Sequence, residues 1–293
     1  MVDLRDLRCL TALARHKHFA RAAEECGMSQ PAFSMRIRNL EERLGTALVK
    51  RGNRFQGLTA EGEAILQHAR KILDDVRALE QDVRAVKGEV TGCLTLGAIP
   101  TTIAYAAQLA IRLRDSNPGL TLRIVSDTSL GIQQGVDDST YDAGLTYSEG
   151  VSTDLLKLEA LYQERYVLLA PRTLAPRDSG VATWAEAAKV PLCLLEPHMQ
   201  NRRILDQVFA DCGLQPSVIS ETNGFTAAMV MAVHGMAATI VPEVYLEAVV
   251  LDGGVVALPL EQPIVEKSVG LITPGRNPNI PVLQALRRAA DLS

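Results

Sequence analysis

The sequence predicts an α/β protein with an α-helix-rich, winged helix-turn-helix N-terminal domain and an effector domain of two doubly wound α/β subdomains. Three patterns predict this architecture: helical apolar spacing near the N-terminus, a heptad stripe after it, and alternating short strands and helices in the remainder. A chain of 293 residues is long enough for two or three hydrophobic cores. The predicted domains are a head over 1–60, a linker helix over 61–89, and a body over 90–293 whose subdomains cover about 90–161 with 267–293 and about 162–266.

The three helices of the head are predicted from apolar spacing and from residues that suit helix ends. Leucines at 4, 7 and 10 indicate a helix over 3–16, and an alanine-rich segment over 19–26 indicates a second. Gly27 suits a left-handed turn, Ser29 suits an N-cap, and Pro31 suits a first helical turn. An apolar stripe from Phe33 to Leu44 then marks a third helix over about 30–44. Two short helices joined by a tight turn form a helix-turn-helix.

The outward face of the third helix and the segment after it suit DNA. Gln side chains pair with adenine, Arg with guanine or phosphate, and Met contacts the thymine methyl group. Residues 48–59 form two β-prone pieces around Gly52-Asn53, which predicts a wing whose cations lie near phosphates. An ordinary three-helix bundle with a polar outer face is the alternative. The predicted DNA-binding residues are Ser29, Gln30, Pro31, Ser34, Met35, Arg36, Arg38, Lys50, Arg51 and Arg54.

The charge of the chain is divided unevenly between the head and the rest. The whole chain carries a net charge of −4, but residues 1–60 hold 11 Lys and Arg against 6 Asp and Glu, a net +5. The remaining residues therefore carry −9. A basic head on an acidic body indicates a polyanionic partner for the head alone, although a solvated helix face can show the same excess.

On these residues the head resembles the LysR-type transcriptional regulators. The resemblance rests on the runs Phe19–Glu25, Met28–Ser34, Ile37–Gly45 and Leu58–Gly62, which keep the spacing of that family. It implies that Gln30, Pro31 and Ser34 lie near bases in the major groove of double-stranded promoter DNA. It also implies an effector domain similar to periplasmic binding proteins and contact with RNA polymerase. Met35-Arg36 and Leu48-Val49-Lys50-Arg51 depart from common family residues, so base preference cannot be copied from relatives.

Residues 60–88 predict a long helix with an apolar seam. The apolar positions step by four and three residues over three heptads, which is typical of helix pairing. The seam packs either on the body of its own chain or on a second chain. The resemblance favours the second interpretation and implies a homodimer or homotetramer. The predicted dimerisation residues are Ile65, Ile72, Val76, Leu79 and Val83.

The body predicts a ligand crevice where strands end and helices begin, because open parallel α/β sheets bind ligands there. Gly97–Thr102 and Glu196–Arg202 are the two main candidate loops, and helix N-termini in such loops favour an anion. Plain turns with N-caps are the alternative for each loop alone. The resemblance places a small-molecule effector there, often a carboxylate or another anion. The predicted effector-binding residues are Pro100, Thr101, Thr102, Thr128, Thr146, Pro197, His198 and Met199.

Other functional classes lack support in the sequence. No apolar run reaches the ~18–20 residues of a membrane span, and no signal peptide is evident, so a soluble cytoplasmic protein is predicted. We expect no enzyme, no cofactor and no metal site, since catalytic motifs and clustered metal ligands are absent. The class of solute-binding proteins fits the body but does not explain the head. The class of architectural DNA binders fits the head but does not explain the predicted ligand crevice. Cys193 and Cys212 are either redox-active or structural thiols, and the burial expected for Cys193 favours a structural one.

Overall fold

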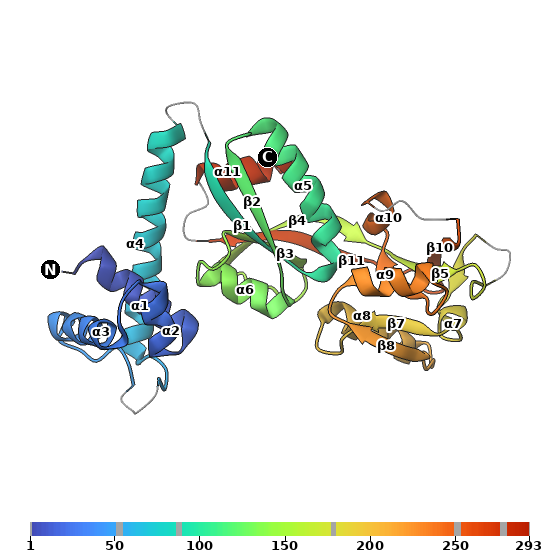
Figure 1. Ribbon diagram of the computed structural model, residues 1–293, viewed down its shortest axis with the longest axis horizontal. Helices are drawn as coiled ribbons and strands as arrows, with labels where there is room; N and C mark the ends of the chain where they lie inside the picture. Colours follow the sequence, from blue (N-terminus) through green and yellow to red (C-terminus); the bar gives the residue numbers. More distant parts are fainter. Residues whose placement is uncertain are drawn as a thin grey trace. The chain divides into compact units, whose positions relative to one another are not determined.

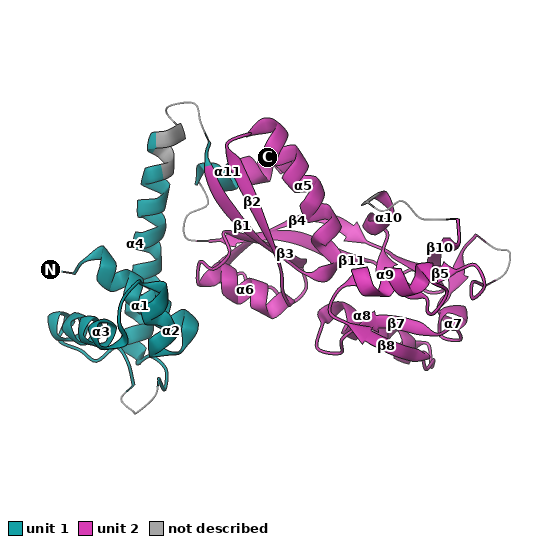
Figure 2. Ribbon diagram, viewed as in Figure 1, with its two compact units in different colours: residues 1–91, 276–284 teal, residues 92–275, 285–293 magenta. Residues whose placement is uncertain are grey.

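The computed structural model describes residues 2–50, 55–85, 90–176, 180–248, 253–275 and 280–292. It forms two compact units, one of residues 1–91 with 276–284 and the other of residues 92–275 with 285–293 (Figure 2). The first unit holds the helices α1 to α4, and the second holds the β-sheets (Figure 1). Within the described residues, no helix has both the length and the apolar character that a membrane crossing requires.

Three helices form the head: α1 (Leu4–His16), α2 (Phe19–Glu25) and α3 (Gln30–Leu44). Their ends follow from local chemistry. Asp3 and Asp6 form a capping box at the start of α1, and the Ser29 hydroxyl accepts a hydrogen bond from the backbone N–H of Ala32 at the start of α3. Gly27 has a φ of 64°, which lets the chain turn sharply between α2 and α3. The predicted helix-turn-helix is therefore present with nearly the predicted boundaries.

The helix α4 (Ala60–Ala85) begins against the head. Leu66 is buried in the head core, Ile65 packs against that core in part, and Ala69 is fully buried. Gly62 makes this approach possible, because a Cβ atom there would lie 2.1 Å from the carbonyl oxygen of Leu48. Ile65, predicted in the dimerisation seam, thus belongs in part to the head core of its own chain.

In the second unit, lobe I is built on a five-stranded sheet in the order β2-β1-β3-β11-β4, with the helices α5 and α6. Three strands pair in parallel as expected, but β11 runs antiparallel to both β3 and β4, so the sheet is mixed. The elements are β1 (Gly92–Ala98), a 3-10 turn η1 (Pro100–Thr102), α5 (Ile103–Ser116), β2 (Leu120–Ser126), α6 (Ser129–Asp137), β3 (Ala143–Tyr147), β4 (Leu156–Glu164) and β11 (Lys267–Pro274). The last helix of the chain is α11 (Pro281–Ala289).

Lobe II holds a four-stranded sheet in the order β6-β10-β5-β9 and a pair of parallel strands, β7 and β8. Its strands are β5 (Tyr166–Pro171), β6 (Ala182–Thr183), β7 (Leu192–Leu195), β8 (Val218–Thr222), β9 (Thr239–Pro242) and β10 (Val255–Glu261). Its helices are α7 (Trp184–Ala187), α8 (Gln200–Asp211), α9 (Phe225–Val233) and α10 (Val244–Ala248). The chain passes between the lobes twice, from β4 to β5 and from β10 to β11.

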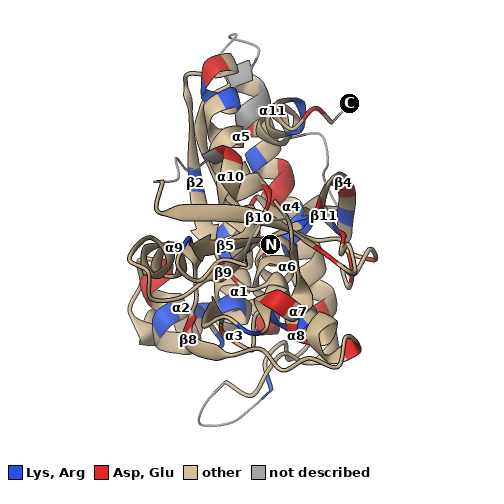
Figure 3. Ribbon diagram, turned by 90° about the vertical axis from the view of Figure 1, so that its right-hand side faces the viewer, with Lys and Arg blue, Asp and Glu red and all other residues tan. Residues whose placement is uncertain are grey.

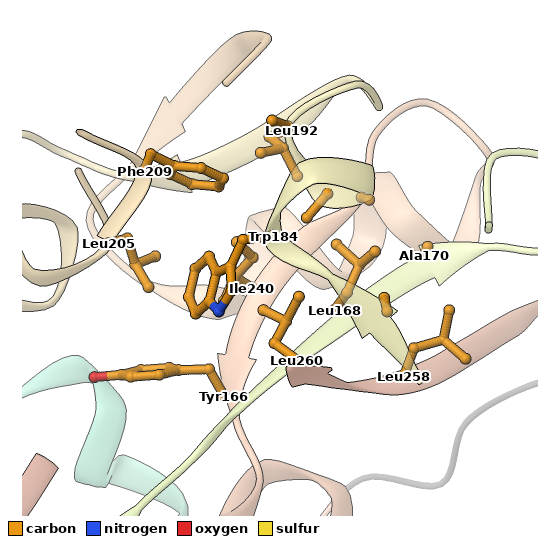
Figure 4. Close-up of a cluster of buried hydrophobic side chains, with 14 of the residues drawn as sticks. Tyr166, Leu168, Ala170, Trp184, Leu192, Leu205, Phe209, Ile240, Leu258 and Leu260 are labelled. Carbon is orange, nitrogen blue, oxygen red and sulfur yellow. The ribbon is translucent and has the colours of Figure 1, made fainter. Parts of the chain in front are cut away.

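Trp184 is at the centre of the lobe II core (Figure 4). Its ring centroid lies 5.4 Å from that of Phe209 in an edge-to-face contact, and its indole N–H donates to the carbonyl oxygen of Pro263 at 2.9 Å. Tyr166 contributes its ring to the same cluster, whereas its hydroxyl group points away from it. This orientation directs the hydroxyl towards lobe I, where it meets Tyr147.

Candidate functional site

The outward face of α3 presents the side chains that the sequence predicts for base contact. Gln30 and Arg38 are exposed, Met35 is 62% exposed, and Ser34 is half-buried. Phe33, on the opposite face, is fully buried in the head core. Residues four apart share one side of a helix, so Gln30, Ser34 and Arg38 form one polar row suited to a groove.

Arg36 occupies a different place from these side chains. Its guanidinium donates to the carboxylate of Asp6 at 2.9 Å, and Arg43 donates to the other oxygen of the same carboxylate at 2.6 Å. Asp6 is only 1% exposed, so its charge depends on these two partners. The structure therefore gives Arg36 an ion pair inside the head and does not group it with the row of Gln30, Ser34 and Arg38. The sequence pattern gave no signal for this pairing, because Asp6 lies thirty residues away.

We expect Gln30→Ala to reduce affinity for the cognate DNA site by about 5- to 100-fold, since a bidentate base contact contributes ~1–3 kcal/mol of discrimination. Affinity for a scrambled duplex should stay within twofold. Gel shifts with both duplexes at one salt concentration measure this, and Arg21→Ala provides a control on an exposed residue of α2. Equal losses on both duplexes would remove Gln30 from the base-reading residues.

The predicted wing is partly described. Val49 and Leu58 form an antiparallel bridge, and the Glu41 carboxylate accepts hydrogen bonds from the backbone N–H groups of Leu48 and Val49 at 2.8 and 3.0 Å. These contacts fix the base of the wing to α3. Lys50 is exposed there, while Arg51 and Arg54 lie outside the described residues. Figure 3 marks the positions of the charged residues on the described chain.

The side chains of the apolar seam of α4 become more exposed beyond the head core. Beyond the head core, Ile72 is 43%, Leu79 64% and Val83 56% exposed, and Val76 is half-buried. Large apolar side chains in a regular row on a helix surface are typical of a contact with another helix. This exposed seam, defined here as Ile72, Val76, Leu79 and Val83, is available to a second chain.

A narrow cleft, with free space of about 10 Å³, opens between lobe I and lobe II. Three helical segments start at it: η1 leading into α5, α6 with Thr128 as its N-cap, and α8 with Met199 as its N-cap. Unpaired backbone N–H groups and the helix dipole make such starts attractive to negative charge. The residues that line the cleft are Ile99, Pro100, Thr101, Thr128, Ser129, Tyr147, Leu195, Met199, Gln200 and Asn201.

The cleft wall offers polar groups without charge. Ser129 and Asn201 are 6% and 3% exposed, and Ser129 Oγ and Asn201 Oδ1 have no hydrogen-bond partner among the described residues. Unsatisfied buried polar atoms are costly, so they suit a ligand that completes their hydrogen bonds. None of the described residues lining the cleft is charged. Arg202, which follows Asn201, directs its guanidinium to Leu195 O and Glu221, each at 2.8 Å.

The structure brings together half of the effector-binding residues that the sequence predicts. Pro100, Thr101, Thr128 and Met199 line the cleft. Thr102 and Thr146 are buried, and neither they nor Pro197 are among its lining residues. His198 is exposed and pairs with Glu196 at 3.2 Å. Tyr147 and Asn201 also line the cleft; neither is among the predicted effector-binding residues, although Tyr147 follows Thr146 and Asn201 lies in the candidate loop Glu196–Arg202.

Behind the cleft wall lies a buried carboxyl group that the sequence did not indicate. Glu164, at the end of β4, is 2% exposed and accepts a hydrogen bond from the Tyr147 hydroxyl at 2.6 Å. Burial raises the pKa of Glu164 to about 7, while the hydrogen bond from Tyr147 and the nearby hydroxyl groups of Tyr166 and Thr101 act in the opposite direction. The Asn201 amide in turn donates to the Tyr147 hydroxyl at 3.2 Å, which joins lobe II to lobe I.

The two cysteines considered as redox groups have different surroundings. Cys193 is fully buried in β7, and burial raises the pKa of its thiol. Cys212, directly after α8, is exposed. Neither lines the cleft. A protonated buried thiol reacts slowly, so the surroundings of Cys193 agree with a structural role.

Comparison with family models places both units of the chain in one family. Residues 4–63 match the model "Bacterial regulatory helix-turn-helix protein, lysR family". Residues 87–291 match the model "LysR substrate binding domain". The two matches together cover nearly the whole chain, and the second alone covers more than half of it.

Individual relatives and solved structures agree with these matches. The SDS degradation transcriptional activation protein of a Pseudomonas species is 42% identical over 143 residues, 48% of this chain and 47% of that protein, so the match spans about half of that relative. The HTH-type transcriptional regulator CfxR of Cupriavidus necator is 30% identical over 218 residues, 74% of this chain and 68% of the relative. A full-length OxyR variant from Pseudomonas aeruginosa covers 100% of this chain and 95% of its own, with a TM-score of 0.76 and 22% identity. Full-length CbnR in complex with its target DNA has a TM-score of 0.60 at 22% identity, over 99% of both chains.

Proposed function

The chain belongs to the LysR family of bacterial helix-turn-helix regulators, and we propose that it controls promoter activity in response to a small anion held in the cleft between its lobes. One observation carries the choice of an anion: three helix starts converge on a cleft with unsatisfied buried polar atoms and no charged lining residue. Carboxylates and similar anions accept from the backbone N–H groups and from the Ser129 hydroxyl, whereas Asn201 Oδ1 is an acceptor and requires a donor group on the ligand or a water molecule.

The proposed mechanism couples the cleft to DNA through the arrangement of the lobes. An anion that contacts Thr128 and Ser129 on lobe I and Gln200 and Asn201 on lobe II favours one angle between the lobes over others. Paired recognition helices in a homodimer or homotetramer then take a different spacing on a dyad site. The change in DNA bend alters contact with RNA polymerase. Such coupling requires unequal affinity of the anion for the two arrangements.

DNA contact in this proposal comes from two parts of the head. Gln30, Ser34, Met35 and Arg38 reach base edges, with Ser29 and Pro31 beside them at the start of α3. Lys50 and the predicted wing cations Arg51 and Arg54 neutralise phosphates, so affinity falls steeply with salt. Arg36 would have to break its ion pair with Asp6 in order to contact DNA, and we propose that it positions α3 instead.

A footprint on the DNA upstream of the gene for this protein tests the proposal. The full chain is incubated with that DNA with and without each member of a panel of small carboxylates and other anions. A protected dyad site whose pattern one anion alters supports the proposal. Ser129→Ala should keep the footprint but require at least about fivefold more anion for the same change, because one hydrogen bond to a charged group is lost. Ser116→Ala, at the end of α5 and away from the cleft lining, is the matched control.

Two results would contradict the proposal. A footprint that is insensitive to salt, or no footprint on this DNA, would argue against the DNA-binding face. A footprint that responds to an anion equally in the original protein and in Ser129→Ala would remove the cleft as the site.

A further inference from the structure

Glu164 is a carboxyl group with an unusual position at the first passage between the lobes. It ends β4, and β5 of lobe II begins two residues later at Tyr166. The intervening residue, Arg165, does not neutralise it, because the Arg165 guanidinium donates to Glu266 at 2.8 Å on the surface. An acid this deeply buried usually has a cationic partner, yet no Lys, Arg or His among the described residues forms an ion pair with Glu164.

Hydroxyl groups approach Glu164 from several elements, while β11 places Lys267 directly opposite it in the sheet, with the Lys267 ammonium group donating to Glu149 at 3.0 Å. Tyr147 comes from β3, Tyr162 from β4 itself, Tyr166 from β5 and Tyr245 from α10, and all four interact electrostatically with its carboxylate. Thr101 from η1 adds a fifth hydroxyl. Burial raises the pKa of each of the four tyrosines, so they stay neutral at any physiological pH. Glu164 is therefore the group in this cluster that changes charge near neutral pH.

The same cluster forms part of the cleft wall. Tyr147, Thr101 and Asn201 line the cleft, and Tyr147 also donates a hydrogen bond to Glu164. An anion in the cleft would thus be separated from the carboxylate by a single layer of side chains. Two negative charges so close together in a poorly solvated interior repel each other strongly, and protonation of the carboxyl group removes this repulsion.

We propose that the cleft binds its anion together with one proton, and that the carboxyl group of Glu164 takes up this proton. The proposal rests on the anion-binding function proposed above and adds a second signal, the proton concentration. It makes Glu164 a positioning residue, because it acts on the ligand through Tyr147.

The hydrogen bonds give a route for this action. When Glu164 is ionised, the Tyr147 hydroxyl donates to its carboxylate and accepts from the Asn201 amide. A proton from solvent that binds to Glu164 turns the carboxyl group into a donor, so it no longer requires the Tyr147 hydrogen. That hydrogen then becomes free to point into the cleft and donate to the anion. One proton is bound, and no covalent bond other than the new O–H bond changes.

Calorimetric titration of the full chain with benzoate tests the proposal, with benzamide as an uncharged analogue. Titrations at pH 6 and pH 8, each in two buffers of different ionisation enthalpy, report the number of protons taken up. With a carboxyl pKa of about 7, benzoate affinity should fall about tenfold from pH 6 to pH 8, and uptake at pH 8 should approach one proton per benzoate. Benzamide, which carries no charge, should show no such dependence.

Glu164→Gln keeps the size of the side chain and mimics the protonated acid. We expect it to bind benzoate with an affinity that varies less than twofold between pH 6 and pH 8 and without proton uptake. Asp154→Asn, which neutralises an exposed acid outside the cleft lining, should behave like the original protein. The uptake measured on the unaltered chain is informative even if Glu164→Gln fails to fold.

The outcomes separate the two proposals. Benzoate binding without proton uptake by the unaltered chain would overturn the role of Glu164 and leave the anion cleft in place. Uptake that persists in Glu164→Gln would assign the proton to another group and would also overturn it. If neither benzoate nor any anion of the panel binds to the chain at pH 6, the anion cleft itself is refuted, and the proton proposal is refuted with it.

Discussion

Leu79→Glu is expected to convert the protein into a monomer and to lower its affinity for a dyad DNA site by at least about 100-fold. Leu79 is 64% exposed at the middle of the exposed seam, so the change costs little within one chain. In a paired helix it would bury a carboxylate against apolar side chains, which is strongly unfavourable. Two linked heads gain a factor of about 10² to 10⁴ over one head, and a monomer loses this gain. Light scattering measures the mass, and gel shifts measure the affinity.

Gln67→Glu is the matched control, since it adds the same charge to α4 at an exposed position outside the seam. Its mass and DNA affinity should equal those of the original protein. Val76→Glu should repeat the effect of Leu79→Glu from a neighbouring position on the seam. An unchanged mass for both seam variants would mean that the copies pair through another surface.

The stability of the fold is expected to decrease as pH rises from about 4.5 to about 7, through the titration of Glu164. The unfolded carboxyl group ionises near pH 4.5, whereas burial raises its pKa in the folded state to about 7. Between these values the folded chain holds a proton that the unfolded chain releases, so the stabilising contribution is complete below pH 4.5 and is lost as pH rises through 7. The loss should be roughly 3 kcal/mol.

Urea unfolding at pH 5, 6, 7 and 8 gives the free energy of unfolding of the original protein and of Glu164→Gln. The difference between the two values at each pH isolates the contribution of Glu164. The variant cannot ionise at this position, so it should gain relative stability over this pH interval. Asp154→Asn should show a constant difference, because that acid is on the surface. A constant difference for Glu164→Gln as well would show that Glu164 titrates in its ordinary range.

The head could be predicted almost completely because its signals are local. Ser29 caps α3, Pro31 lies in its first turn, and the stripe from Phe33 to Leu40 forms its buried face. Each of these signals affects only residues nearby in the chain, and α3 begins and ends as predicted. In contrast, β4, β10 and β11 were not predicted. The strand β11 contains Gly270 and ends at Pro274, which are residues that usually interrupt strands. Gly270 is needed for a nonlocal reason, because a Cβ atom there would lie 2.6 Å from Leu158 of the adjacent strand.

The candidate site also contains residues that local sequence signals identify and residues that only the fold brings together. Residues at strand ends, such as Pro100 and Thr128, could be marked from the alternation of strands and helices alone. Glu164 could not, because an acid next to Arg165 resembles a surface pair in the sequence. Its burial follows from the convergence of β3, β5 and α10, which are far apart in the chain. Similarly, Arg36 resembles a DNA contact until the fold places Asp6 beside it.

The ion pairs of Asp6 have a consequence for protein engineering. Exchanging recognition helices between relatives is a direct way to redirect a regulator to new promoters. A graft of α3 from this chain would carry Arg36 and Arg43 into a host whose first helix lacks an acid to receive them, and the reverse graft would leave Asp6 buried with its charge uncompensated. The transferable module therefore includes the first turn of α1 as well as α3, so chimeras should exchange residues 3–44 as one piece.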